Sequence, residues 1–246
     1  MEELERIGRL PGQNLMQRTE VLSIKQTTRR AGLAEYVYSY IKDLLLDGRF
    51  DTLETLPVEN FAKDLNVSRQ PVMDSLKRLA LEGFVLIVPQ VGCQVRKYSP
   101  DEISDFFRLF AEGEALIAEL LAERADRSDI AVISSISEQI GELRELKTNP
   151  EAIGLQYRHL NRRLHFEMRR ASRSIPVAEV VESLGDRSDF FVATSRRPLF
   201  ADRLKSAHAE HEAIIEAVRS KDPQRARDVM KQHILQIGER LRNKVS

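Results

Sequence analysis

The sequence predicts a mainly α-helical protein with two structured parts. The first has three helices and a β-hairpin, and the second is an all-α bundle of about six helices. Three observations predict this: apolar residues recur at helical spacing along most of the chain, one β-branched hairpin pattern interrupts them at residues 84–97, and no strand-like run follows. We place an N-terminal arm at residues 1–32, a first domain at 33–98 and a helical domain at 99–246.

Composition limits the class of protein. A chain of 246 residues, 42% of them hydrophobic, can form one or two domains with a buried core. Cys93 is the single cysteine, which excludes a disulfide framework and a multi-cysteine zinc ribbon. The 38 Lys and Arg balance 38 Asp and Glu, so any binding to nucleic acid needs a local patch. No apolar run reaches the roughly 18 residues of a membrane helix, and we expect a cytoplasmic protein without a membrane partner.

Three helices are predicted between residues 33 and 83. The first has apolar residues at helical spacing from Leu33 and should end at Gly48, where a C-terminal glycine belongs. The second covers about two turns at residues 58–65. The third has Ser68 in position to cap its N-terminus and Pro71 in its first turn, where the missing N–H is not needed.

A β-hairpin is predicted after the third helix. Two runs that contain β-branched residues, 84–88 and 93–97, flank a short connection, and Gly92 supplies the turn. Three helices followed by such a hairpin describe a winged helix-turn-helix.

The rest of the chain is predicted to be helical. Ser99 and Pro100 have the pattern of a helix start, and breaks such as Asn149-Pro150 and Asp222-Pro223 separate the later segments. Without strands among them, these helices should form a bundle. The expected helices are 100–126, 128–147, 151–172, 176–195, 202–220 and 223–243.

The start of the third helix carries side chains that can read DNA. In a helix-turn-helix, the second helix enters the major groove with its N-terminus first. There, arginine can bond guanine or phosphate, glutamine can bond adenine, and serine can bond phosphate. An ordinary solvated helix face is the alternative that these residues leave open. The predicted DNA-binding residues are Ser68, Arg69, Gln70, Pro71, Lys77, Arg78, Gly92 and Gln94.

Residues 66–72 and 76–83 resemble the signature of the GntR family of bacterial transcription regulators, in order and in spacing. The resemblance covers about residues 34–97 and implies DNA contacts by Arg69, Gln70, Pro71 and Gly92. Met73 and Asn60 stand where many members carry arginine. Because two cations are missing, the resemblance predicts weaker phosphate or guanine contacts and an operator that differs from the usual family sequence.

Three of the five histidines, His165, His211 and His233, have a spacing that can build a metal site. Asn161 and His165 are one helical turn apart and share a face, while His211 and His233 lie on two later helices. These four side chains can converge on one divalent cation, Zn, Ni, Mn, Fe or Co, in the bundle core. Histidines that are simply hydrogen-bonded in the core or at the surface are the alternative. The other two histidines, His159 and His208, fit no motif.

Over about residues 100–240 the chain resembles FCD, the effector-binding domain of FadR-type GntR regulators. Its metal-binding members carry Asp-x-x-x-His, then Glu-His-x-x-Ile, then His followed by an aliphatic residue. This chain has matching segments at 161–165, 210–214 and 233–234. The resemblance therefore implies a divalent metal held by Asn161, His165, His211 and His233.

Two departures from the FCD pattern affect the expected ligands. Asn161 replaces an aspartate, so we expect weaker metal binding and stronger attraction for an anionic effector. Phe110, four residues before Glu114, stands where the family's arginine is expected. This weakens the expectation of a typical hydroxy-acid effector.

Together these patterns predict a homodimeric, DNA-binding transcription repressor that is not an enzyme. An organic-acid effector, bound with the metal in the helical domain, would alter binding to double-stranded operator DNA. The candidates for the dimer seam are Phe106, Phe107, Phe110, Leu116 and Leu120. The alternative for the three aromatic residues is the intramolecular core. The alternatives are a metal-dependent enzyme that uses the three histidines, and a metal-free regulator that senses acyl ligands. The absence of a His-Glu-x-x-His pattern disfavours the enzyme, and the histidine set disfavours the acyl sensor.

Overall fold

The structure, a computed structural model, describes residues 32–146, 149–195 and 204–242. Apart from Gly32, the predicted N-terminal arm lies outside these ranges. The chain divides into two compact units. Among the described residues, one comprises 32–43 and Thr55–Cys93, and the other comprises Leu44–Glu54 and the residues from Gln94 onward.

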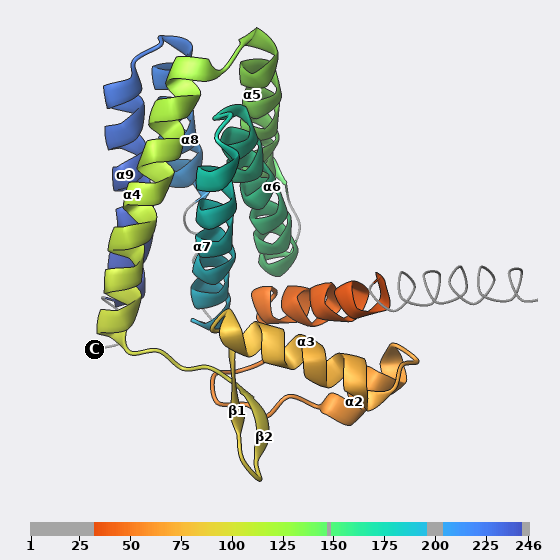
Figure 1. Cartoon of the computed structure of the whole chain (residues 1–246). Coiled ribbons are helices and arrows are strands. Elements are labelled where there is room, and N and C mark those ends of the chain that lie inside the picture. The colour runs from red at the N-terminus through yellow and green to blue at the C-terminus, as the bar shows by residue number, and fades with distance from the viewer. Residues whose placement is uncertain (1–31, 147–148, 196–203, 243–246) are drawn as a thin grey trace, which may run out of the picture. The chain divides into compact units, whose positions relative to one another are not determined.

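The N-terminal part has the predicted winged helix-turn-helix elements (Figure 1). The chain is helical over 32–46, and the hairpin strands β1 and β2 pair as a two-stranded sheet. Apolar side chains from the helices and the hairpin, among them Ile41, Leu76 and Phe84, are fully or almost fully buried and form its core. The labelled elements are α2 (Val58–Asp64), α3 (Arg69–Leu81), β1 (Val85–Val88) and β2 (Gly92–Val95).

The turns of this part depend on left-handed backbone conformations. Gly48 has a φ of 69° and ends the first helix, as the sequence predicted. Gly83 has a φ of 85° and ends α3, where the N–H of Phe84 bonds the carbonyl of Leu79 at 3.0 Å. In the hairpin, Gln90 also has a positive φ, 64°, and Gly92 is already the first residue of β2. The tight turn is therefore shared between them and is not made by Gly92 alone.

The C-terminal part is the predicted all-α bundle, and its described residues contain no strand. Ser99 caps the first helix in a capping box with Glu102, with Pro100 at the first position. Asp126 caps the second helix in the same way. The elements are α4 (Pro100–Arg124), α5 (Arg127–Glu142), the 3₁₀ turn η1 (Leu143–Glu145), α6 (Pro150–Ala171), α7 (Ile175–Thr194), α8 (Leu204–Arg219) and α9 (Pro223–Arg242).

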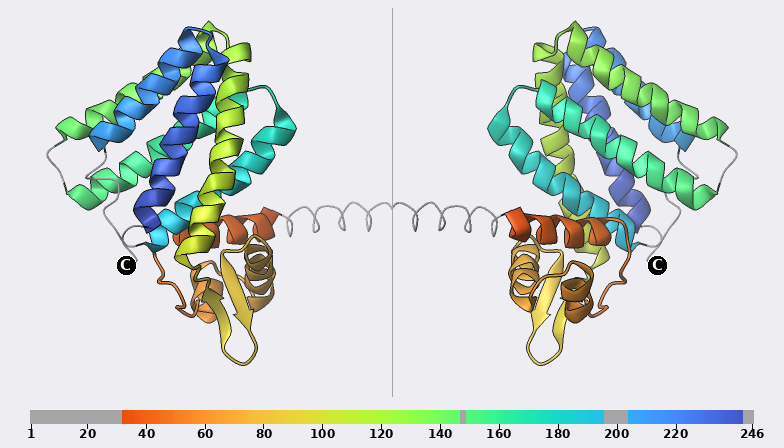
Figure 2. Two further views of the ribbon diagram at one scale, coloured as in Figure 1. Left: turned by 90° about the vertical axis from the view of Figure 1, so that its left-hand side faces the viewer. Right: turned by 90° about the vertical axis from the view of Figure 1, so that its right-hand side faces the viewer.

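Helix α4 is the centre of the bundle, because it packs against α6, α7, α8 and α9. It runs beside α9 over much of its length (Figure 2). A Cβ atom on Gly238 of α9 would lie 2.6 Å from the Cβ of Phe107, so glycine permits this close approach. Phe107 and Phe110 are buried among helices of the same chain. The core alternative therefore describes these two side chains, and they are not available for a dimer seam.

None of the helices in the described ranges is long and apolar enough to cross a membrane.

Candidate metal centre and DNA-reading surface

The bundle brings three histidines from three different helices together. His165 lies on α6, His211 on α8 and His233 on α9, and each is at least nine-tenths buried. One ring nitrogen from each lies within 4.8 Å of those of the other two. Three imidazole nitrogens that converge in a core form a donor set suited to a divalent transition metal.

A carboxylate orients one of these imidazoles. Nδ1 of His233 lies 2.7 Å from Oε2 of Glu210, the residue before His211 on α8. A carboxylate at Nδ1 favours the tautomer that leaves Nε2 as the lone-pair donor, an arrangement common around histidine ligands of metals. Sequence spacing did not predict this contact, because Glu210 and His233 lie on different helices.

Behind the histidines lies a buried ion pair between α4 and α6. Arg169 donates hydrogen bonds from Nη2 at 2.6 Å and from Nε at 3.2 Å to Oε1 of Glu114, which is fully buried. The same oxygen lies 3.5 Å from Nδ1 of His165. Burial raises the pKa of Glu114, but the charges and hydrogen bonds of Arg169 and His165 outweigh it and lower the pKa to about 2. Glu114 is therefore ionised at neutral pH.

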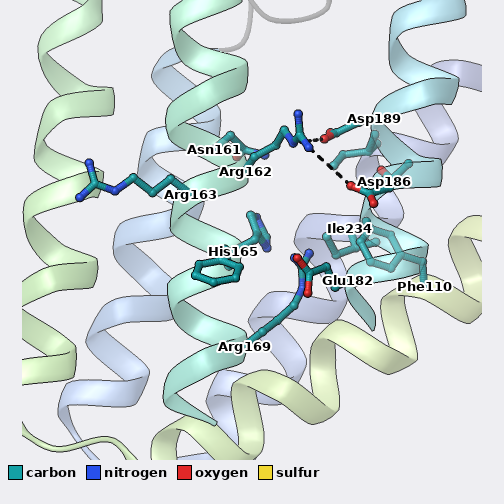
Figure 3. A pocket seen from close by; sticks show the side chains of 14 residues that line it. Phe110, Asn161, Arg162, Arg163, His165, Arg169, Glu182, Asp186, Asp189 and Ile234 are labelled. Carbon is teal, nitrogen blue, oxygen red and sulfur yellow. Dashed lines mark ion pairs between the residues drawn. The ribbon is translucent and has the colours of Figure 1, made fainter. Parts of the chain in front are cut away.

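A cavity of about 230 Å³ opens beside this cluster, mainly between α6 and α7 (Figure 3). His165, Arg169 and Asn161 line it from α6, and Phe110 lines it from α4. Asn161 therefore lies on the cavity side together with His165, as their spacing predicted, and its Oδ1 accepts a 3.4 Å hydrogen bond from the hydroxyl of Tyr157. Whether Asn161 also binds a metal stays a prediction.

The α7 wall of the cavity is acidic. Arg162 of α6 reaches across to Asp189 at 3.2 Å and to Asp186 at 3.6 Å (Figure 3). Burial, with the nearby Asp186, raises the pKa of Asp189 to about 6, although Arg162 opposes this shift. Sequence reasoning missed these acids, because nothing in their spacing shows which helix they face.

The other two histidines lie outside the cluster. His159 is exposed, and His208 is half-buried with its Nδ1 3.5 Å from Oγ of Ser137 on α5. Their positions agree with the absence of a motif around them.

On the N-terminal part, the start of α3 is exposed. Ser68 occupies the cap position, but its side chain makes no capping hydrogen bond. The side chain of Arg69 is 67% exposed and lies 3.4 Å from Oε1 of Glu59. Gln70 donates hydrogen bonds to the carboxylate of Asp74 at 2.9 and 3.0 Å, and Lys77 contacts the same carboxylate at 3.1 Å. These polar groups are accessible, although several of them form ion pairs or hydrogen bonds with acidic neighbours.

Arg78 lies on a different face of α3. Its guanidinium stacks 3.5 Å from the ring centre of Tyr38 and donates to Glu35 at 2.7 Å and to Glu82 at 3.1 Å. This side chain therefore ties α3 to the first helix, and its predicted phosphate contact would require these bonds to be released.

The predicted wing residues lie on β2. Gly92 is exposed and Gln94 is half-buried. Between them, Cys93 is buried and its pKa is raised to about 11 by that burial, so its thiol is unreactive.

Two family models match the chain, and they match the two parts just described. Residues 33–95 match the bacterial regulatory proteins of the gntR family, and residues 109–236, more than half of the chain, match the FCD domain. The chain belongs to the GntR family of transcription regulators, with a C-terminal FCD domain.

Relatives of this GntR regulator agree with that assignment. This chain is 23% identical over 200 residues to the HTH-type transcriptional repressor GlaR of Escherichia coli K12. The match covers 80% of this chain and 90% of GlaR. It is 21% identical to the transcriptional regulator YdhC of Bacillus subtilis 168, covering 80% and 84% of the two chains. Among solved structures, E. coli McbR/YncC superposes with a TM-score of 0.75 at 19% identity, covering 87% of this chain and 99% of that one. This last similarity shows the shared fold.

Proposed function

We propose that this GntR-family regulator is a homodimeric repressor whose operator binding changes when a small carboxylate binds beside a metal in the FCD domain. The observation that carries the proposal is the convergence of His165, His211 and His233 in the core. One of them, His165, also lines the cavity. Three buried imidazoles next to one another disfavour the alternative of a metal-free sensor of acyl chains. Since the protein acts on DNA, we also propose that it works in the cytoplasm.

The metal would be held by the three imidazoles, with Asn161 as a weaker oxygen ligand. The donor set fits, because all three imidazoles are buried and their ring nitrogens converge, and Glu210 orients His233. A bound divalent cation supplies a Lewis-acid position for a ligand carboxylate. The identity of the metal is proposed only as Zn, Ni, Mn or Fe.

DNA would be read by the N-terminus of α3, with Arg69 and Gln70 at the base edges and Ser68 and Lys77 at phosphates. The wing, with Gly92 at its exposed end, would lie against the minor groove. A two-fold operator then requires a second copy of the chain. The effector must bind the two arrangements of that dimer with different affinity, since otherwise it would shift no equilibrium.

Fluorescence anisotropy tests the DNA part. A duplex selected from a random pool by the wild-type protein is compared with scrambled DNA at fixed salt. We expect Arg69→Ala to lose most of the preference for the selected duplex, and Lys63→Ala, which removes an exposed cation at the end of α2, to keep it. Equal binding of both duplexes by the wild type would contradict the proposal.

Metal analysis of protein purified without chelator tests the metal part. The wild type should retain about one divalent ion per chain, the number for a single site of this kind. The His211→Ala/His233→Ala variant should lose the ion, whereas His159→Ala should keep it, because His159 is exposed and outside the cluster. Equal metal content in all three proteins would rule out this site.

A further inference from the structure

We propose that Arg169 on α6 is the residue that anchors the effector's carboxylate, in place of the α4 cation for which this chain has Phe110. The inference rests on the proposed function, since it takes a small carboxylate as the effector, and it names the residue that would bind it.

Arg169 has the position for this role. It lies one helical turn after His165 on the same face of α6, lines the cavity, and is only 8% exposed. Its Nε and Nη2 donate to Oε1 of Glu114. Its Nη1 makes no hydrogen bond to the part of the chain that the structure describes, so the Nη1–Nη2 edge of the guanidinium is left for a second anion. A planar guanidinium can bind two carboxylates on two of its edges.

Phe110 occupies the α4 position at which the FCD pattern has an arginine. It lies one turn before Glu114 on α4 and lines the same cavity. An arginine at that position would bring its charge to the cavity from the α4 wall. Here an apolar ring fills the space, and the cation paired with Glu114 comes from α6 instead. Compared with the FCD pattern, the cavity therefore keeps a cation next to Glu114. This cation comes from α6 and not from α4, so its position differs.

Gly185 on α7 makes room for this arrangement. A Cβ atom at residue 185 would lie 2.7 Å from Nη2 of Arg169 and 3.4 Å from its Cζ. The guanidinium can occupy its position because no side chain projects from α7 there. This is a second observation, independent of the ion pair, that the site is built around Arg169.

The other two cations that line the cavity fit the role less well. Arg162 is held between Asp186 and Asp189. Arg163 is exposed and extends away from the other lining side chains (Figure 3). Arg169, by contrast, shares the carboxylate of Glu114 with His165 and lies one turn after it on the same helix. With a divalent cation at the histidines, that end of the cavity would be positive despite Glu114, which favours a carboxylate there.

The test uses full-length protein loaded with Co²⁺, whose visible spectrum reports its ligands, and acetate as the probe. We expect acetate to change the wild-type spectrum in a saturable way. Arg169→Gln should raise the acetate Kd about 10- to 100-fold, the loss expected for hydrogen bonds to a charged group. Arg170→Gln, the same change at the next residue, should leave the Kd unchanged, because Arg170 is exposed and pairs with Glu167 and Asp129 outside the cavity.

A rescue variant separates anchoring from folding. Phe110→Arg in the Arg169→Gln background returns a cation to the cavity from α4, so acetate binding should recover by at least about tenfold. Equal acetate affinity in the wild type and in Arg169→Gln would overturn the inference, and so would an absence of wild-type binding.

A metal-independent readout keeps this inference distinct from the metal proposal. The same variants are titrated with ¹³C-labelled acetate by NMR in metal-free protein, where Arg169 should still bind the anion, more weakly. Failure to take up Co²⁺ would remove the metal part of the proposed function, while the NMR arm would still decide the role of Arg169.

Discussion

Nδ1 of His233 and Oε2 of Glu210 lie 2.7 Å apart, and this contact joins α9 to α8 directly beside His211. The pair fixes the direction in which the imidazole presents its second nitrogen. It also places the orientation of His233 under the control of the residue that precedes His211 in the sequence. The candidate metal centre is therefore held by contacts between helices and not only by the three histidines.

We expect Glu210→Gln to weaken metal binding about 10- to 100-fold, because the carboxylate that orients His233 is lost. Competition with a chelator of known affinity measures the effect. Glu212→Gln is the matched control, since Glu212 flanks His211 on its other side and contacts Ser137 instead. If both variants bound metal equally well, Glu210 would have no orienting role.

Gly185→Ala should destabilise the protein by about 1–3 kcal/mol, because the new Cβ would lie 2.7 Å from Nη2 of Arg169. Gly154→Ala is the control: no atom lies within 4 Å of its Cβ position on α6. There, the better helix propensity of alanine should stabilise the protein by roughly 0.5–1 kcal/mol. The free energy of unfolding in urea gives both values, and opposite signs are expected.

Asp189 should make stability depend on pH. Its pKa is raised from 3.8 to about 6 in the folded protein. Between these two values the unfolded chain has lost the proton that the folded protein still holds, so the contribution of Asp189 to stability falls as pH rises and is level above about 6.

The Asp189→Asn variant isolates this effect. Relative to the variant, the wild type should lose about 2–3 kcal/mol between pH 4 and pH 7. Thermal or urea unfolding at several pH values checks this, and a difference that does not change with pH would contradict it.

Arg69 and Arg78 should separate DNA binding from stability. Arg78→Ala removes the stacking on Tyr38 and the bonds to Glu35 and Glu82, so we expect a loss of about 1 kcal/mol in stability. Arg69→Ala should leave stability within about 0.5 kcal/mol and weaken specific DNA binding. Unfolding curves and anisotropy on the same two proteins measure both. The reverse pattern would show that Arg78 is the main contact to DNA.

Local features of the sequence predicted much of the fold. Gly48 ends a helix, Ser99 and Pro100 begin one, and the β-branched runs after Gly83 form a hairpin. Each depends on backbone preferences of a few adjacent residues, so each is readable without knowing the rest of the molecule. The spacing of Asn161 and His165 was informative for the same reason, since 3.6 residues per turn places them on one face.

The sequence by itself determined which residues share a helix face, and family spacing added that three histidines should meet. Only the tertiary structure decided that Arg169 pairs with Glu114, 55 positions away, that Glu210 holds His233, and that Arg78 lies on Tyr38. The reason is physical. Helical periodicity sets the direction of a side chain around its own axis, but its partner depends on how the helices pack, which is a property of the whole core.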